Sequence, residues 1–323
     1  MAVVLTVLVV ALATVVLLKV VTRSPASGDT AAGTPRATGS AAPASSAEST
    51  PHSASPSATQ SASTSSSKTA PSVHTPQGLW WGVDSTRSIS STTIANVRAW
   101  YRGHPRPQFW GRYLSGSFGT SRAELAYARA QRIYVYLIVH DRNCSHCNGG
   151  DLCGNDRTGA QAQADAHAAL STAHRLRLPA RATLFKDIEQ VSSCRGEPTS
   201  AYLLGWYHAV RGTSYRVGFY GNVHKQYYDF PRAYCRALAG DPSLGGGAEL
   251  AMNENEPRIG APRGTTGPRN APAFHPQSPS CAPASATKIW QYGESLTTAN
   301  ATDIDQARPD TPGLLAPDGT ATP

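Results

Sequence analysis

The stretch Arg181-Ala-Thr-Leu-Phe-Lys-Asp-Ile-Glu189 decides how the rest of the chain is interpreted. Apolar and β-branched residues run directly into acidic ones, a pattern typical of a short buried strand whose end reaches solvent. Because alternate side chains of a strand share a face, Asp187 and Glu189 point the same way, while Ile188 points into the opposite packing layer. The stretch therefore predicts a strand that presents two carboxyl groups at one end.

Two carboxyl groups on one face of a strand can divide the work of acid catalysis. Like charges roughly 6–7 Å apart raise the pKa of one partner, which leaves one carboxyl protonated and the other ionised at neutral pH. General acid cleavage of a glycosidic bond needs that asymmetry. The same pair can equally be two solvated acids, or acids that neighbouring arginines neutralise, since acidic pairs are common on protein surfaces. Asp187-Ile188-Glu189 by itself leaves both interpretations open.

The composition divides the 323 residues into four segments. Residues 1–22 are mainly apolar, and residues 23–76 are rich in Ser, Ala, Thr and Pro. The second segment buries too little apolar surface to offset chain entropy, so we expect a disordered linker there. Residues 77–307 are enough for one large core, and we expect one folded domain. Residues 308–323 are expected to be a disordered tail.

The first segment predicts export. Ala2 to Leu18 carries no charge, and as a helix it would be about 26 Å long, enough to cross the hydrocarbon core of a membrane. It is either a signal anchor or a signal peptide, and the lack of a clear Ala-x-Ala site favours the anchor. Lys19 and Arg23 follow the apolar run, opposite to the charge arrangement that exports a downstream domain. We predict an extracytoplasmic protein, secreted or anchored in the membrane through this helix.

The charge balance narrows the expected partners. Basic residues exceed acidic ones by 29 to 21, which favours polyanionic surroundings such as an acidic cell-wall polymer, anionic lipid or nucleic acid. No zinc-finger, RNP or helix-turn-helix pattern is present, so nucleic acid is not an expected partner. Esterase, zinc-protease and nucleotidase functions have no motif in the sequence, because it contains no Gly-x-Ser-x-Gly, His-Glu-x-x-His or P-loop. No cofactor is predicted.

All six cysteines lie in the expected domain. An even number in an exported chain indicates disulfides, although sequence leaves every pairing open. The alternative is a zinc site, because His140 and His146 lie close to three of the cysteines. The second ligand pair of a zinc finger is missing, so no metal site is predicted. The cysteines are Cys144, Cys147, Cys153, Cys194, Cys235 and Cys281.

Strand-like and helix-like stretches alternate along the domain. Alternation at βα spacing predicts a parallel sheet, and the number of units favours a closed TIM-like (β/α) barrel over an open doubly wound sheet. No Gly-x-Gly-x-x-Gly follows the first strand, so a dinucleotide-binding fold lacks its main support. The expected strands are 79–84, 108–114, 133–139, 181–189, 215–220, 248–252 and 287–292, and an ordered segment, 303–307, follows the last of them. The expected helices are 88–101, a helix from the capping box Ser121–Glu124, 159–178, 197–210 and 223–238.

A barrel would bring the acids together. Asp84 closes the first strand, Asp187 and Glu189 close a middle strand, and Asp303 and Asp305 follow the last. Active sites of such barrels collect at the C-terminal ends of the strands. Three separate segments are therefore expected to deliver carboxyl groups to one mouth.

Seven short motifs stand in a fixed order between residues 79 and 307: Trp81-Gly-Val-Asp84, Gly111-Arg-Tyr-Leu114, Ala123-Glu-Leu125, Asp187-Ile-Glu189, Gly218-Phe-Tyr-Gly221, Trp290-Gln-Tyr292 and Asp303-Ile-Asp-Gln306. This ordered set resembles the glycoside-hydrolase-like domain of secreted bacterial proteins, a domain of unknown function. That domain is distantly similar to the lysozymes of glycoside hydrolase family 25. The resemblance implies a TIM-like barrel, complete or imperfect, with a carbohydrate site at its mouth.

The resemblance also implies a substrate class and residue roles. The expected partner is peptidoglycan or another cell-wall polysaccharide. Glu189 matches the general acid, Asp187 its companion, and Asp84 the acid at the end of the first strand. Other members of the motifs are candidates for substrate binding, and the two late acids match the family's pattern only loosely. These candidates are Arg112, Tyr113, Tyr220, Trp290, Gln291, Tyr292, Asp303 and Asp305.

Two positions depart from the family's pattern. Lys186 stands directly before Asp187, where a neutral residue is usual, and Met252-Asn-Glu254 stands where a tryptophan-containing strand is expected. By strand alternation Lys186 should face outward, although a twist would let it pair with an acid. Trp290 and Tyr292 occupy alternate positions of a strand, so they are either a stacking platform for sugar rings or part of the core.

The predicted function is an exported glycosidase of muramidase type, in which Glu189 protonates the leaving oxygen. Asp187 or Asp84 would stabilise the developing positive charge, act as a base, or orient the acetamido group of the substrate. One alternative is a catalytically silent module that keeps the barrel mouth as a carbohydrate-binding groove. Another is a metal-dependent hydrolase that uses the carboxylates or the cysteine loop.

Overall fold

The computed structural model describes residues 78–100, 106–140, 158–188, 199–222, 229–252, 269, 271–283, 285–293 and 302–323. All of them belong to one compact unit, Ser67–Pro323. No helix within these ranges combines the length and the apolar character that crossing a bilayer requires. The expected anchor and linker, four of the six cysteines and Glu189 lie outside the described residues.

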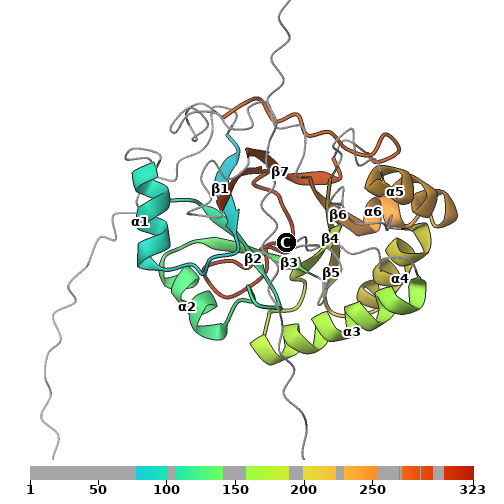
Figure 1. The fold of residues 1–323 in the computed structure, drawn as a ribbon, viewed down its shortest axis with the longest axis horizontal. Helices are drawn as coiled ribbons and strands as arrows, with labels where there is room; N and C mark the ends of the chain where they lie inside the picture. Colours follow the sequence, from blue (N-terminus) through green and yellow to red (C-terminus); the bar gives the residue numbers. More distant parts are fainter. Residues whose placement is uncertain are drawn as a thin grey trace, which may run out of the picture. The chain divides into compact units, whose positions relative to one another are not determined.

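Eight strands close into one barrel, in the order in which they occur along the chain. Neighbours from β1 to β7 are parallel, whereas β8 is antiparallel to both β7 and β1. Figure 1 shows the strands as a ring with the helices outside it. The closed α/β barrel was predicted, but the direction of its last strand was not. The strands are β1 (Trp80–Ser85), β2 (Phe109–Tyr113), β3 (Tyr134–Val139), β4 (Thr183–Ile188), β5 (Arg216–Gly221), β6 (Ala248–Met252), β7 (Thr287–Gly293) and β8 (Thr302–Ala307).

A helix follows each of the first five strands, and local signals fix where several of them begin. Ser121 caps α2 by accepting a hydrogen bond from Glu124 N at 3.1 Å, as the predicted capping box requires. Pro231 lies in the first turn of α5, where a missing N–H costs no helical hydrogen bond. The helices are α1 (Ser91–Trp100), α2 (Arg122–Ala130), α3 (Gly159–Leu176), α4 (Ser200–Arg211), α5 (Asp229–Gly240) and the short α6 (Leu244–Gly247).

The strands separate two apolar layers. Their outward side chains pack with the helices in the larger core, while the inward side chains form a second, largely aromatic cluster inside the barrel. Glycine provides room where large inward side chains meet: a Cβ on Gly111 would lie only 2.5 Å from the Cβ of Asp84 and would also collide with the Tyr136 ring. The buried inward cluster is Phe109, Tyr136, Ile138, Phe185, Tyr220, Ala251, Ile289, Ala307 and Leu314.

The C-terminal residues 308–323 close the end of the barrel at which β3 and β4 begin. The backbone of Leu315 exchanges hydrogen bonds with Val135 at 2.8 and 3.0 Å, and Thr183 N donates to Gly313 O at 2.9 Å. Leu314 is fully buried in the inward cluster. The C-terminus accordingly lies over the centre of the ring (Figure 1). The expectation of a disordered tail is wrong, because this short segment satisfies its backbone groups on two strands and buries two leucines.

One disulfide lies within the described residues. Cys235 of α5 is bonded to Cys281, with a Cα–Cα distance of 5.6 Å. The bond links α5 to the connection that leads from β6 to β7. It confirms that cysteines of this chain form disulfides and selects one pairing that sequence left open.

We expect Leu314→Ala to destabilise the barrel by about 2–5 kcal/mol, because it leaves a cavity among inward-facing aromatic side chains. Chemical denaturation of the full-length protein measures this change. Pro309→Ala is the matched control, since Pro309 lies in the same tail but is exposed. Equal stability of both variants would show that the tail adds nothing to the barrel.

Candidate functional site

Three carboxyl groups from three strands lie inside the barrel. Asp84 stands near the end of β1, Asp187 near the end of β4, and Asp305 in β8. Their exposed fractions are 3%, 1% and 0%, so all three are removed from bulk water. Asp303 is half-buried and pairs directly with Asp84 in the ladder between β1 and β8. Because β8 is antiparallel, its first residues reach the end of the barrel at which β1 finishes.

Tyr136 of β3 bridges two of these carboxyl groups. Its hydroxyl lies 3.2 Å from Asp84 Oδ2 and 3.1 Å from Asp305 Oδ2. A hydroxyl carries one hydrogen, so both contacts are satisfied together only when one carboxyl is protonated and donates to the phenol oxygen. The bridge therefore holds one proton between Asp84 and Asp305.

The surroundings of Asp84 shift its pKa upward. Burial raises it well above its ordinary value, and the negative charges of Asp305 and Asp187 raise it further, against the opposing hydrogen bond from Tyr136. Burial and the same charge of Asp305 also raise the pKa of Tyr136, so the phenol stays neutral. Burial therefore favours the protonated, uncharged form of Asp84.

Asp187 has a different partner. Its Oδ2 lies 3.1 Å from Nδ1 of His140, directly after β3, and the ring of Tyr113 packs edge-on against this imidazole with centroids 5.4 Å apart. The other carboxyl oxygen, Oδ1, is buried and has no hydrogen-bond partner within the described part of the chain. Lys186 faces away from the barrel interior, as strand alternation predicted: its Nζ donates to Asp187 O at 2.9 Å and lies 5.7 Å from the centroid of the Tyr202 ring.

Several of the predicted binding residues share this interior. Tyr220 belongs to the inward cluster, and its hydroxyl donates to Oε1 of Gln291, which is paired with Asp305 in the ladder between β7 and β8. Tyr113 packs against the same cluster and is half-buried. The structure thus brings together residues that the sequence places up to about two hundred positions apart. Glu189, the predicted general acid, lies outside the described residues.

Arg112 does not belong to this group, because it lies outside the strand wall. Its guanidinium is 1% exposed and pairs with Glu124 of α2, with Nε 2.6 Å from Oε1. It also donates to the backbone oxygens of Ser85 and Phe118, while Glu124 Oε1 accepts from Ile89 N at 2.7 Å. Arg112 therefore holds the connections after β1 and β2 together, and its predicted contact with substrate does not fit this position.

Trp290 and Tyr292 likewise face the outer layer of β7. Trp290 is 2% exposed and packs edge-on against Phe274, and the Tyr292 hydroxyl accepts from Nε1 of Trp81 at 3.1 Å. Both side chains belong to the larger hydrophobic core on the outer side of the strands. Of the two interpretations that the sequence left open, the structure favours core packing over a sugar platform.

Tyr136 and His140 are the residues that sequence reasoning missed. Tyr136 looks like an ordinary inward core residue of an apolar strand, and His140 was considered only as a metal ligand. The pairing of β1, β2 and β3 explains the contact of Tyr136 with Asp84. Gly111 of β2 is paired with Asp84 on one side and with Tyr136 on the other, and its lack of a side chain lets the two side chains meet. Within the described ranges, no three His, Cys, Asp or Glu side chains form a group that could hold a metal ion.

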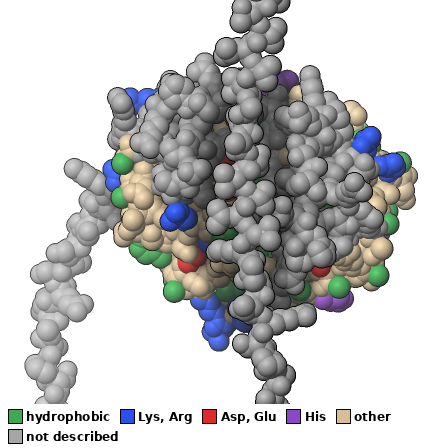
Figure 2. Space-filling model, viewed as in Figure 1, with side chains coloured by type: hydrophobic (Ala, Val, Ile, Leu, Met, Phe, Trp, Pro, Cys, Tyr) green, Lys and Arg blue, Asp and Glu red, His purple; other side chains and the backbone are tan. Residues whose placement is uncertain are grey.

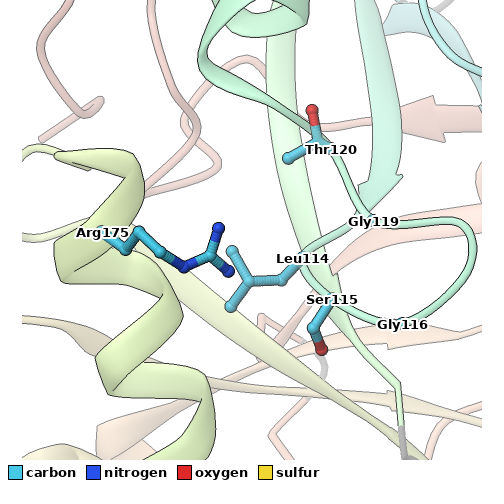
Figure 3. Close-up of a pocket in the computed structure, with 6 residues that line it drawn as sticks. All are labelled: Leu114, Ser115, Gly116, Gly119, Thr120 and Arg175. Carbon is cyan, nitrogen blue, oxygen red and sulfur yellow. The ribbon is translucent and has the colours of Figure 1, made fainter.

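A separate pocket lies beside the connection between β2 and α2. Its volume is about 360 Å³, and no carboxyl group lines it. Figure 3 shows the guanidinium of Arg175, from α3, pointing toward Leu114 across this space. The pocket offers no acid for chemistry, so we place the candidate site in the barrel interior.

Lys and Arg side chains do not gather on one patch of the face shown in Figure 2. The visible basic groups stand in several separate places around its edge. The overall surplus of basic residues is consistent with an acidic partner, but the visible face gives it no single docking patch.

Residues 98–307, more than half of the chain, match the family described as Rv2525c-like, glycoside hydrolase-like domain. A solved structure of an uncharacterized protein from B. stearothermophilus is 27% identical, with a TM-score of 0.57, and the match covers 71% of this chain and 96% of that one. None of the curated proteins matches the sequence.

Two further solved structures are similar to this chain at lower sequence identity. The Tat-secreted protein Rv2525c of Mycobacterium tuberculosis, solved with L-tartrate, is 11% identical with a TM-score of 0.43, over 71% of this chain and 95% of that one. The modular autolysin LytC of Streptococcus pneumoniae, solved with a synthetic peptidoglycan ligand, is 12% identical with a TM-score of 0.37, over 71% of this chain and 46% of that one.

We expect Asp84→Asn to stabilise the protein, and more so as the pH rises. The raised pKa means that the folded state holds a proton which the unfolded chain releases above about pH 4, so the penalty grows from that pH up to the folded pKa. The variant removes this penalty. Its melting temperature should equal that of the wild type near pH 4 and exceed it by about 2–4 °C for each kcal/mol relieved at pH 7 to 8.

Asp318→Asn is the control for this pH series. Asp318 is exposed, and hydrogen bonds from Thr320 lower its pKa, so its replacement cannot raise stability with pH in the same way. A wild type and an Asp84→Asn variant with parallel melting curves at every pH would contradict a protonated Asp84.

We expect Arg112→Met to destabilise the protein by about 3–5 kcal/mol, because it leaves the carboxylate of Glu124 buried without its partner. Adding Glu124→Leu should restore much of that loss. Denaturant titration of the two variants provides the measurement. If Arg112→Met weakened carbohydrate binding without a loss of stability, the predicted role of Arg112 in substrate binding would be supported instead.

Proposed function

The chain belongs to the family of Rv2525c-like, glycoside hydrolase-like domains, and we propose that it is an exported glycosidase that cleaves the glycan of peptidoglycan. The observation that carries the proposal is the group of carboxyls inside the barrel, in which Asp84 and Asp187 occupy different electrostatic environments. Paired carboxyls with separated protonation states are the requirement of acid-assisted glycoside cleavage.

The proposed roles follow from these environments. Glu189 transfers its proton to the leaving oxygen as the bond between that oxygen and the anomeric carbon breaks. Asp187, paired with His140, stabilises the positive charge that develops on the sugar ring. Asp84 orients the acetamido group of the substrate. A water molecule then forms a bond to the anomeric carbon and returns a proton to Glu189, which restores the acid.

Export is part of the same proposal. The bond between Cys235 and Cys281 supports it, because disulfides persist in oxidising compartments outside the cytoplasm. The apolar segment 1–22 would act as signal anchor or signal peptide, and 23–76 as the tether to the barrel. The surplus of basic residues suits an acidic cell-wall polymer.

A binding module without catalysis is the second candidate. The low exposure of Asp84 and Asp187, 3% and 1%, favours it, because a nucleophile or charge stabiliser must reach the sugar. In that case the interior carboxyls hold the barrel together and carbohydrate binds around them. The two candidates differ in whether soluble fragments are released.

Release of dye from labelled peptidoglycan tests the proposal. We expect wild-type protein to release dye, and Glu189→Gln or Asp187→Asn to lower the rate by about 10²–10⁴-fold, since each removes a group needed in the transition state. Asp318→Asn is the matched control, an exposed carboxylate in the C-terminal tail, and should retain full activity.

The other outcomes separate the alternatives. Equal release by wild type and Glu189→Gln excludes Glu189 as the acid. Sedimentation of the protein with peptidoglycan without any release supports the binding module. Loss of activity on exhaustive chelation would support a metal-dependent hydrolase instead.

A further inference from the structure

His140 occupies a position that the roles assigned so far do not explain. It follows β3 directly, so it lies at the same end of the barrel as Asp187 near the end of β4. The side chains are 9% and 2% exposed, and Nδ1 lies 3.1 Å from Asp187 Oδ2. A second His–Asp pair, His208 with Asp241, has a longer distance of 3.4 Å and exposed fractions of 55% and 23%. The first pair is therefore the one shielded from water.

Because the pair is buried, Asp187 depends on its contact with His140. A carboxylate removed from water is costly unless a hydrogen-bonded counter-charge compensates it. Asp187 Oδ1 has no hydrogen-bond partner among the described residues, so Oδ2 and His140 provide the contact seen for this carboxyl group. The edge of the Tyr113 ring, 5.4 Å away between centroids, limits rotation of the imidazole.

We propose that His140 is a positioning residue, which donates a hydrogen bond from Nδ1 to Asp187 and holds that side chain oriented toward the sugar ring. This inference deepens the proposed function and rests on it for its catalytic consequence. The His–Asp contact itself can be tested in the free protein.

Charged and polar groups from three other strands surround the pair. Tyr113 from β2 contacts the imidazole, and Asp187 from β4 accepts its hydrogen bond. Asp84 from β1 senses the charge of Asp187, and Asp305 from β8 is joined to Asp84 through the hydroxyl of Tyr136. When protonated, His140 is a cation close to these acids, whereas Lys186, another basic residue of the described chain, faces the outer layer.

This arrangement gives His140 a role in holding the Asp187 side chain in place. The negative charge of Asp187 is one of the causes that raise the pKa of Asp84, so its position affects Asp84 as well. Loss of His140 would let the Asp187 side chain rotate. Misplacement of a catalytic group by about 1 Å can cost roughly 10²-fold in rate.

Nuclear magnetic resonance of the full-length, 15N-labelled protein tests the contact without any substrate. The imidazole signals of His140 are identified by their absence in His140→Asn. We expect the His140 ring to titrate at a higher pH in wild type than in Asp187→Asn, because the carboxylate favours imidazolium. The same comparison for His208 in Asp241→Asn should give a smaller change, since water screens that exposed pair.

Release of peptidoglycan fragments tests the catalytic consequence. We expect His140→Ala to lower kcat about 10- to 100-fold with little change in polymer binding. His140→Asn places an amide nitrogen near the position of Nδ1, so it should recover most of the rate and lack the wild-type dependence on imidazole protonation. His208→Asn should behave as wild type.

The outcomes distinguish this inference from the proposed function. An unchanged His140 titration in Asp187→Asn overturns the positioning role, whatever the protein hydrolyses. Equal kcat of His140→Ala and wild type also overturns it. Titrations that shift as expected, in a wild type that releases no fragments, support the contact and overturn glycan hydrolysis.

Discussion

Burial of carboxyl groups inside a closed barrel is the constraint on which the site depends. Asp84, Asp187 and Asp305 are almost without solvent contact, and each buried charge costs several kcal/mol unless a partner compensates it. Tyr136 provides the partner for two of them by holding one proton between the carboxyls, and His140 faces the third. The interior acids thus have different surroundings, and this difference is the basis of the proposed chemistry.

The rest of the fold keeps these groups in place. The ion pair between Arg112 and Glu124 joins the connections after β1 and β2, so the end of β1 that carries Asp84 is tied to α2. At the opposite end of the barrel, Leu314 and the backbone of the C-terminal tail cover the first residues of β3 and β4. The chain itself therefore closes that end of the barrel.

Stability and function oppose each other at Asp84. Its raised pKa means that the folded state disfavours the charged form of this carboxyl. The same residue that can orient a ligand therefore lowers the stability of the fold at neutral pH. Gly111 shows a related compromise, because the absence of a side chain there is what allows Tyr136 to approach Asp84. A buried carboxyl and a glycine inside a strand both reduce stability, and such unfavourable features are expected at a functional site.

The sequence by itself determined the alternation of strands and helices, the closed barrel and the delivery of Asp84 and Asp187 to its interior, because these follow from local hydrophobic periodicity and strand order. Only the tertiary structure decided the direction of β8, the sides of the wall taken by Arg112 and Trp290, and the packing of the tail. It also revealed Tyr136 and His140 as partners of the acids. The physical reason is that ladder register and contacts between distant strands set these features, and neither is encoded in the pattern of any one segment.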